Sequence, residues 1–250
     1  TPEPTQLAVK MKELNRGLGR NLRATSFALS LKQSYIDIDT EIAERVSVTD
    51  TGRTTLPVTT DFRHDFPASF YMTTINARFG LTDFVELYAD VGATYDFDSS
   101  EPRYVYGLGL RQNLLETDFY KSSKLYFAFL ADFHKGQFEE DYKSKDGNTW
   151  HKSSDWREIM LKLEGGIVYS RLIVFVCGNY LDYRETTTRT QLENLPAPYT
   201  TYKYEDELEE KDHWGFFGGV EYHLTGHSVI YVEGNYNNRN SVTAAYEYRF

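Results

Sequence analysis

Hydrophobic and polar residues alternate along most of the chain, a pattern typical of β-strands with two different faces. In residues 84–97, Leu87 and Val91 lie on one face, and Glu86 and Asp90 lie on the other. Ten such segments are predicted, at 24–39, 66–79, 84–97, 104–115, 124–138, 156–169, 172–184, 213–224, 228–236 and 241–250. Most match the roughly 9–11 residues that a tilted strand needs to cross a bilayer core.

The connections between these segments alternate in length. Short links are expected at 80–83, 116–123, 170–171 and 225–227, and longer ones at about 40–65, 98–103, 139–155 and 185–212, with a small one at 237–240. Short turns at one end and long loops at the other are typical of a transmembrane barrel. We therefore predict an all-β, up-and-down antiparallel transmembrane β-barrel of about ten strands, or twelve if residues 40–65 or 185–212 contain a hairpin.

The composition agrees with this fold class. The chain has 20 Tyr and 16 Phe, and its mean hydropathy of −0.54 suits strands that have only one apolar face. A soluble barrel would have to enclose the Phe-rich faces, and so many aromatic rings would overfill its interior. Aromatic residues near strand ends are expected to form the interfacial girdles, namely Tyr95, Tyr104, Trp156, Tyr169, Trp214 and Tyr246.

The last strand ends on aromatic residues, with Tyr246, Tyr248 and Phe250 on one face. This ending resembles the C-terminal strand of Gram-negative outer-membrane β-barrel proteins. The resemblance covers residues 24–250 and implies a location in the outer membrane, contact with outer-membrane lipid and lipopolysaccharide, and recognition of the terminal aromatic residues by the barrel-assembly machinery. The start of the chain is expected to be a mature end from which a signal peptide was removed.

Residues 1–23 differ from the rest of the chain. Five apolar residues recur at helical spacing (Leu7, Met11, Leu14, Leu18 and Leu22), and five basic ones accompany them (Lys10, Lys12, Arg16, Arg20 and Arg23). We interpret this segment as a short basic helix that plugs the lumen or docks on a periplasmic protein partner. The alternatives are a loosely ordered leader and a helix on the membrane surface.

The polar faces of the predicted strands carry charges of both signs. The expected lumen network consists of Glu86, Asp90, Arg111, Asp132, Lys162, Glu164 and Glu221, with Glu233 nearby. Charges of opposite sign in a narrow lumen are expected to form salt bridges, because each buried charge needs a partner. Ten strands also leave little free bore, so passive conduction should be small.

Two short motifs raise the question of catalysis. Asp96 and Asp98 close the third predicted strand, and Asp132 and His134 lie near the top of the fifth. An Asp that orients a His, opposite an acidic pair, could activate water for peptide hydrolysis. The arrangement is similar to the omptin family of outer-membrane proteases. Omptins carry their Asp-x-His pair on the seventh strand, where this chain has no histidine at 181–184, and the same carboxylates could simply be solvated or paired with arginine.

Three functions therefore stay open: a non-enzymatic barrel that anchors or scaffolds a partner, a narrow or gated channel for ions or small solutes, and an omptin-like protease. A protein partner could bind residues 1–23 or the acidic run 205–212, although that run could also be a solvated loop. No motif for a cofactor or metal site is found. The net charge of −10 argues against nucleic acid as a partner.

Overall fold

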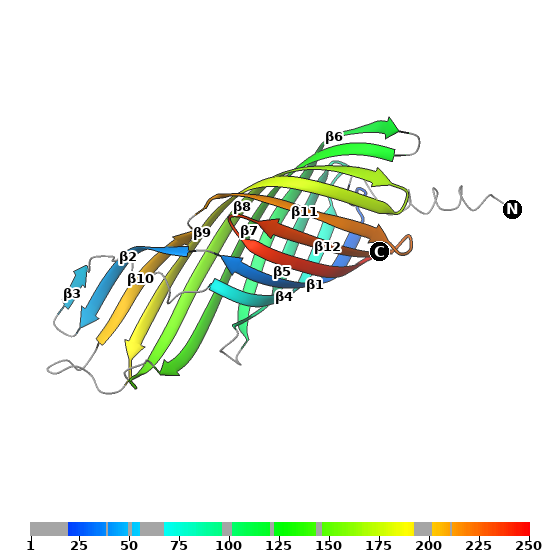
Figure 1. Ribbon diagram of the computed structural model, residues 1–250. Coiled ribbons are helices and arrows are strands. Elements are labelled where there is room, and N and C mark those ends of the chain that lie inside the picture. Colours follow the sequence, from blue (N-terminus) through cyan, green and yellow to red (C-terminus); the bar gives the residue numbers. More distant parts are fainter. Residues whose placement is uncertain are drawn as a thin grey trace.

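Ten antiparallel strands close into a barrel in the computed structural model, which describes residues 20–38, 40–49, 52–55, 68–96, 102–120, 123–143, 147–192, 202–210 and 212–250 (Figure 1). The strands of the closed wall are β1 (Phe27–Ile38), β4 (Ala68–Gly80), β5 (Val85–Asp96), β6 (Arg103–Tyr120), β7 (Ser123–Lys143), β8 (Thr149–Tyr169), β9 (Leu172–Gln191), β11 (Trp214–His223), β12 (Ser228–Tyr236) and β13 (Asn240–Arg249). The barrel closes where β1 pairs with β13. The predicted antiparallel barrel of ten strands is confirmed.

The N-terminal helix is not confirmed. Residues 20–26 are turns and irregular backbone, so the last four residues of the predicted segment 1–23 are not helical, and its first nineteen lie outside the described residues. No helix in the described part of the chain is long and apolar enough to span a membrane.

Three further strands extend the wall beyond the closed barrel. They are β2 (Thr40–Thr49), β3 (Gly52–Thr55) and β10 (Tyr202–Glu210). The first half of β9 pairs with β11, whereas its second half pairs with β10, which in turn pairs with β2. The predicted long loops at 40–65 and 185–212 thus contain strands, but these strands build an extension and do not enlarge the barrel.

The wall is much longer on one side than on the other. β7 and β8 each have 21 residues, whereas β11 and β13 have 10. At about 3.4 Å per residue, this corresponds to about 70 Å against about 34 Å. The segments predicted as a loop at 139–155 are largely the outer ends of β7 and β8, and the link predicted at 116–123 is mostly strand β6. The extension lies at the end of the molecule opposite the short turns (Figure 1).

The two faces of the wall differ sharply in polarity. On β5, Leu87 and Val91 are 41% and 60% exposed on the outside, while Glu86 and Asp90 are 1% and 5% exposed on the inside. The predicted girdle residues Tyr95, Tyr104, Tyr169, Trp214 and Tyr246 are likewise exposed. The prediction for Trp156 is wrong: its side chain is buried inside, with its ring centroid 5.8 Å from that of Phe70 and 6.1 Å from that of Tyr183.

Candidate functional site: the charged lumen and its floor

Four arginine and four glutamate side chains meet inside the barrel near the short turns, the end that is periplasmic in outer-membrane barrels. They form one connected series of ion pairs, Glu86–Arg78–Glu247–Arg249–Glu221–Arg20–Glu164–Arg111. None of these side chains is more than 13% exposed. The signs alternate along the series, so every buried charge has an opposite partner, which burial demands. We call these eight residues the floor ring.

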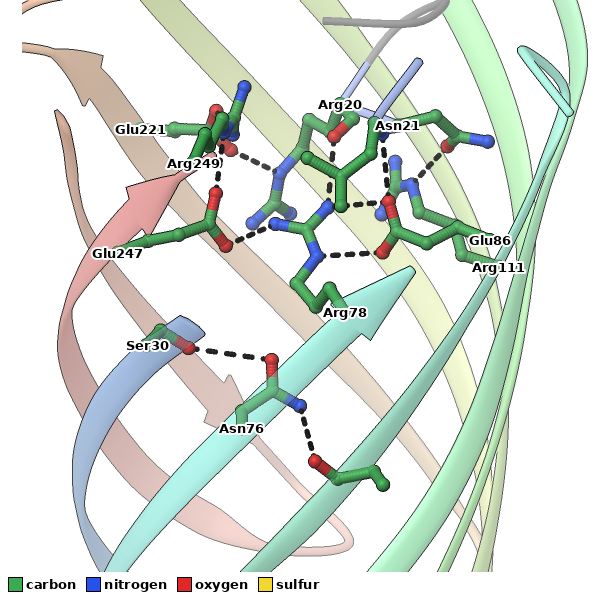
Figure 2. Close-up of polar contacts among 12 residues, drawn as sticks. Arg20, Asn21, Ser30, Asn76, Arg78, Glu86, Arg111, Glu221, Glu247 and Arg249 are labelled. Atoms are coloured by element: carbon green, nitrogen blue, oxygen red, sulfur yellow. Dashed lines mark hydrogen bonds and ion pairs between the residues drawn. The ribbon is translucent and has the colours of Figure 1, made fainter. Parts of the chain in front are cut away.

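Five members of the floor ring are linked by the guanidinium groups of Arg78 on β4 and Arg249 on β13. The Arg78 guanidinium donates to Glu86 (Nε–Oε1 2.7 Å) and to Glu247 (Nη1–Oε2 2.5 Å). Arg249 donates to Glu247 (Nε–Oε1 2.6 Å) and to Glu221 (Nη2–Oε1 3.0 Å). Figure 2 shows these side chains converging from β4, β5, β11 and β13.

Arg20, which precedes the first strand, completes the ring. Its Nη1 lies 3.0 Å from Oε2 of Glu164, and its Nε lies 2.9 Å from Oε2 of Glu221. Its guanidinium carbon lies 3.8 Å from the centre of the Phe175 ring, a cation–π contact. Glu164 is also held by Arg111, with Nη2 2.6 Å from Oε1. Without Arg20, three arginines would face four glutamates, so this segment supplies the charge that balances the floor.

The backbone of residues 20–23 is tied to the same ring. The amide of Leu22 donates to Oε2 of Glu86 at 2.8 Å, and Oδ1 of Asn21 accepts from Nε of Arg111 at 2.8 Å. Both Asn21 and Leu22 are fully buried. Residues 20–23 are therefore part of the packed floor of the lumen, held by backbone contacts as well as by charge (Figure 2).

Residues 22–23 pack closely against Gly80 at the end of β4, where a larger side chain would not fit. A Cβ atom on Gly80 would lie 2.0 Å from the carbonyl oxygen of Arg23, whereas one on Gly178 would have nothing within 4 Å. We expect Gly80→Ala to displace residues 22–23 at a cost of about 1–3 kcal/mol. Trypsin should then cleave the folded barrel after Arg20 several times faster than in the wild type. Gly178→Ala is the matched control, and equal cleavage rates in the two variants would contradict this arrangement.

A second group of charges lies further along the lumen. Lys32 pairs with Asp90 (Nζ–Oδ1 3.2 Å), and His134 lies between two carboxylates, with Nε2 3.4 Å from Asp90 and Nδ1 3.1 Å from Glu158. Arg239 also pairs with Glu158 at 2.7 Å. The imidazole of His134 therefore lies between two carboxylates, one within 3.4 Å of each ring nitrogen.

Between the two groups lies a cavity of about 150 Å³. Its lining includes the Lys162–Asp132 ion pair (Nζ–Oδ2 2.7 Å), Glu233 and the methionines Met72 and Met160. Within the described ranges, no group of three His, Cys, Asp or Glu side chains could hold a metal ion. The cavity is large enough for a few waters or a small ion, because one water occupies about 30 Å³ of liquid volume.

The residues of the protease alternative do not come together. His134 contacts Asp90, whereas Asp96 lies six residues further along β5, which is roughly 20 Å at about 3.4 Å per residue. Asp132 is paired with a lysine and does not orient His134. Asp98 lies outside the described residues. Among the described members, the geometry contains no Asp–His pair opposite an acidic pair.

Several members of the lumen network were not predicted. Arg78, Glu247 and Arg249 belong to the floor ring, and Glu158 and Arg239 to the second group. Glu247 and Arg249 stand on the polar face of the last strand, and Arg78 alternates with apolar neighbours in residues 66–79, so strand alternation was the signal that could have found them.

The acidic run 205–212 does not form a loop over 205–210, which belong to β10. Asp206 is fully buried and pairs with Arg45 (Oδ1–Nε 2.5 Å). Glu205 accepts a hydrogen bond from Lys203 at 2.9 Å, which lowers the pKa of the Glu205 carboxyl. Glu205 and Asp206 therefore stabilise the extension, whereas Glu207, Glu209 and Asp212 of the run are exposed.

The aromatic end of the chain lies on the outer surface beside the first strand. Tyr246, Tyr248 and Phe250 are 48%, 42% and 61% exposed. The Phe250 ring lies 5.7 Å from that of Phe27, and its amide donates to the carbonyl of Phe27 at 2.8 Å. These aromatic residues thus mark the periplasmic rim at the seam of the barrel.

A closed ten-stranded wall with an apolar outer face, aromatic residues at both rims and ionic groups inside suits a bilayer. The fold is that of an outer-membrane β-barrel. Neither a family model nor a curated protein sequence matches this chain.

Solved structures of similar shape are outer-membrane barrels. The outer membrane protease OmpT from Escherichia coli matches with 12% identity and a TM-score of 0.45, over 90% of this chain and 97% of its own. The outer membrane protein OprG from Pseudomonas aeruginosa matches with 10% identity and a TM-score of 0.42, over 91% and 97%. The translocator domain of the autotransporter NalP from Neisseria meningitidis matches with 9% identity and a TM-score of 0.34, over 98% and 93%. At these values the matches carry no conclusion about activity.

Proposed function

We propose that this chain is a non-enzymatic outer-membrane barrel that anchors a periplasmic partner through its N-terminal segment. The observation that carries the proposal is the place of Arg20 in the floor ring, where it pairs with Glu164 and Glu221. Buried ion pairs hold residues 20–23 at the periplasmic end, so a partner bound to residues 1–19 would be attached to the membrane through the barrel.

Two observations favour this role over the other possibilities. In the acidic run that could have bound a partner externally, Asp206 is buried against Arg45 and Glu205 is paired with Lys203. The histidine of the protease alternative has a carboxylate of Asp90 or Glu158 within 3.4 Å of each ring nitrogen, and neither carboxylate belongs to the acidic pair that the protease alternative requires.

A photo-crosslinking residue at Met11 tests the anchoring role in intact outer membranes. We expect a specific adduct with a periplasmic protein from position 11, because the floor ring holds the adjoining residues 20–23 at the periplasmic end. Glu207, which is exposed on the extension, is the control position and should not give the same adduct. Absence of any adduct at Met11, or the same adduct at both positions, would contradict the proposal.

A second candidate function is a narrow channel for ions or small solutes that the same segment gates. The cavity of about 150 Å³ above the floor ring favours it. In this case residues 20–23 would act as a plug, and their removal would connect the cavity with the periplasm.

A further inference from the structure

The cavity in the lumen is lined by one carboxylate without an ionic partner. Glu233 on β12 is half-buried and belongs to the lining. Every other carboxylate of the lining lies within 3.2 Å of a basic side chain. The side chain of Glu233 forms neither an ion pair nor a hydrogen bond within the described ranges. A charge inside a lumen needs a partner, so Glu233 marks a place for a cation.

The other charges around the cavity balance one another without Glu233. The floor ring contains four arginines and four glutamates, and the cations of the second group pair with the carboxylates of that group. Between these groups, Lys162 pairs with Asp132 at 2.7 Å. Lys162 and Arg20 also attract Glu233, but each is already paired with another carboxylate. Glu233 is therefore one negative charge in excess.

The two histidines described inside the lumen do not balance this charge. His134 lies 3.4 Å from Asp90 and 3.1 Å from Glu158, and His223 lies 2.9 Å from Glu221. A proton on either ring would be held by the carboxylates beside it. The excess charge thus stays at the cavity.

The rest of the lining determines which kind of cation fits. Met72, Leu130 and Met160 are at most 8% exposed and give the cavity an apolar side. Asp132 adds an acceptor, because its Oδ1 is buried without a hydrogen-bond partner. A metal ion fits poorly, since no three His, Cys, Asp or Glu side chains among the described residues are placed to hold one. A volume of about 150 Å³ suits an organic molecule of about six non-hydrogen atoms.

We propose that the cavity binds a small organic cation, a primary alkylammonium compound. Its ammonium group pairs with Glu233, and its hydrocarbon part lies against the methionine side chains, which adapt readily to the shape of a ligand. An ammonium group carries three donors, so it can also donate to Oδ1 of Asp132. This site goes beyond the anchoring role and uses no residue of 1–19, so its failure would leave the adduct expected at Met11 unaffected.

Equilibrium dialysis of the detergent-solubilised full chain against radiolabelled n-butylammonium tests the proposal. Overnight dialysis allows for slow entry past residues 20–23. We expect saturable binding of one cation per chain. Glu233→Gln should weaken this binding at least tenfold, because a neutral amide replaces the charged acceptor. Neutral n-butanol should bind the wild type and Glu233→Gln alike, and more weakly than n-butylammonium binds the wild type.

Glu207→Gln is the matched control, because it removes an exposed carboxylate on β10 in the extension. It should bind n-butylammonium like the wild type. Retarded migration on unheated gels should show that both variants are folded barrels. An unchanged affinity of Glu233→Gln, or no saturable binding to the wild type, would overturn the proposal. Displacement of n-butylammonium by equimolar potassium would overturn it as well, since the site would then be one for an inorganic ion.

Discussion

Replacement of Glu164 by Gln is expected to lower the free energy of unfolding by about 3–5 kcal/mol, the usual cost of breaking a buried ion pair from one side. Glu164 is fully buried and accepts from Arg20, Arg111 and the hydroxyl of Tyr126, the last at 2.6 Å. Gln has nearly the same size and shape as Glu, so the loss of stability reports the removal of the negative charge. Urea unfolding of the lipid-reconstituted barrel, followed by tryptophan fluorescence, measures it.

Two further variants separate the ion pair from general effects of substitution. Glu207→Gln removes an exposed carboxylate on β10 and should change the stability by less than about 0.5 kcal/mol. The double variant Glu164→Gln/Arg111→Met removes one charge of each sign, so the ring is balanced again, and most of the loss should be recovered. If Glu164→Gln behaved like Glu207→Gln, the floor ring would not stabilise the barrel.

Arg20→Glu is expected to open the periplasmic end of the lumen. The floor ring would then contain three arginines and five glutamates instead of four of each. The new carboxylate would lie beside Glu164 and Glu221. At 4 Å and an effective dielectric constant of about 20, each such pair repels by about 4 kcal/mol. Residues 20–23 should leave the floor, and single-channel conductance in planar bilayers should rise several-fold, with a preference for cations because carboxylates line the opening.

Two controls accompany this variant: one keeps the positive charge at position 20, and the other alters a charge far from the floor ring. Arg20→Lys preserves the charge and should stay closed, and Arg53→Glu changes an exposed arginine of the extension and should also conduct like the wild type. An unchanged conductance in Arg20→Glu would show that the segment is held by packing alone.

Strand alternation was sufficient to predict the barrel, because its strands face lipid on one side and the lumen on the other. On β5 the predicted faces agree with the observed burial, with Glu86 and Asp90 inside and Leu87 and Val91 outside. The same signal failed for the extension. In residues 186–190, Thr-Thr-Thr-Arg-Thr, both faces are polar, so no alternation marks the outer half of β9.

The pairing of the lumen charges could not be predicted, because it depends on how far each strand is shifted along its neighbour. The protease alternative would have required Asp132 to orient His134, which instead lies beside Asp90 and Glu158 on other strands. Trp156 was expected at the membrane surface and lies inside, because its place on β8 shares the face of Glu158. The basic character of residues 1–23 did indicate attraction to the acidic lumen, but only the structure identifies Arg20 as the residue in the ring.

The most direct test of the closed floor uses the native cysteine. Cys177 is the register partner of Glu164, is 4% exposed, and shares a face of β9 with Phe175, on which Arg20 stacks. A membrane-impermeant maleimide added to folded barrel should label Cys177 slowly in the full chain and at least tenfold faster in a chain that begins at Ala24. Equal labelling rates in the two proteins would contradict the placement of residues 20–23 in the floor of the lumen.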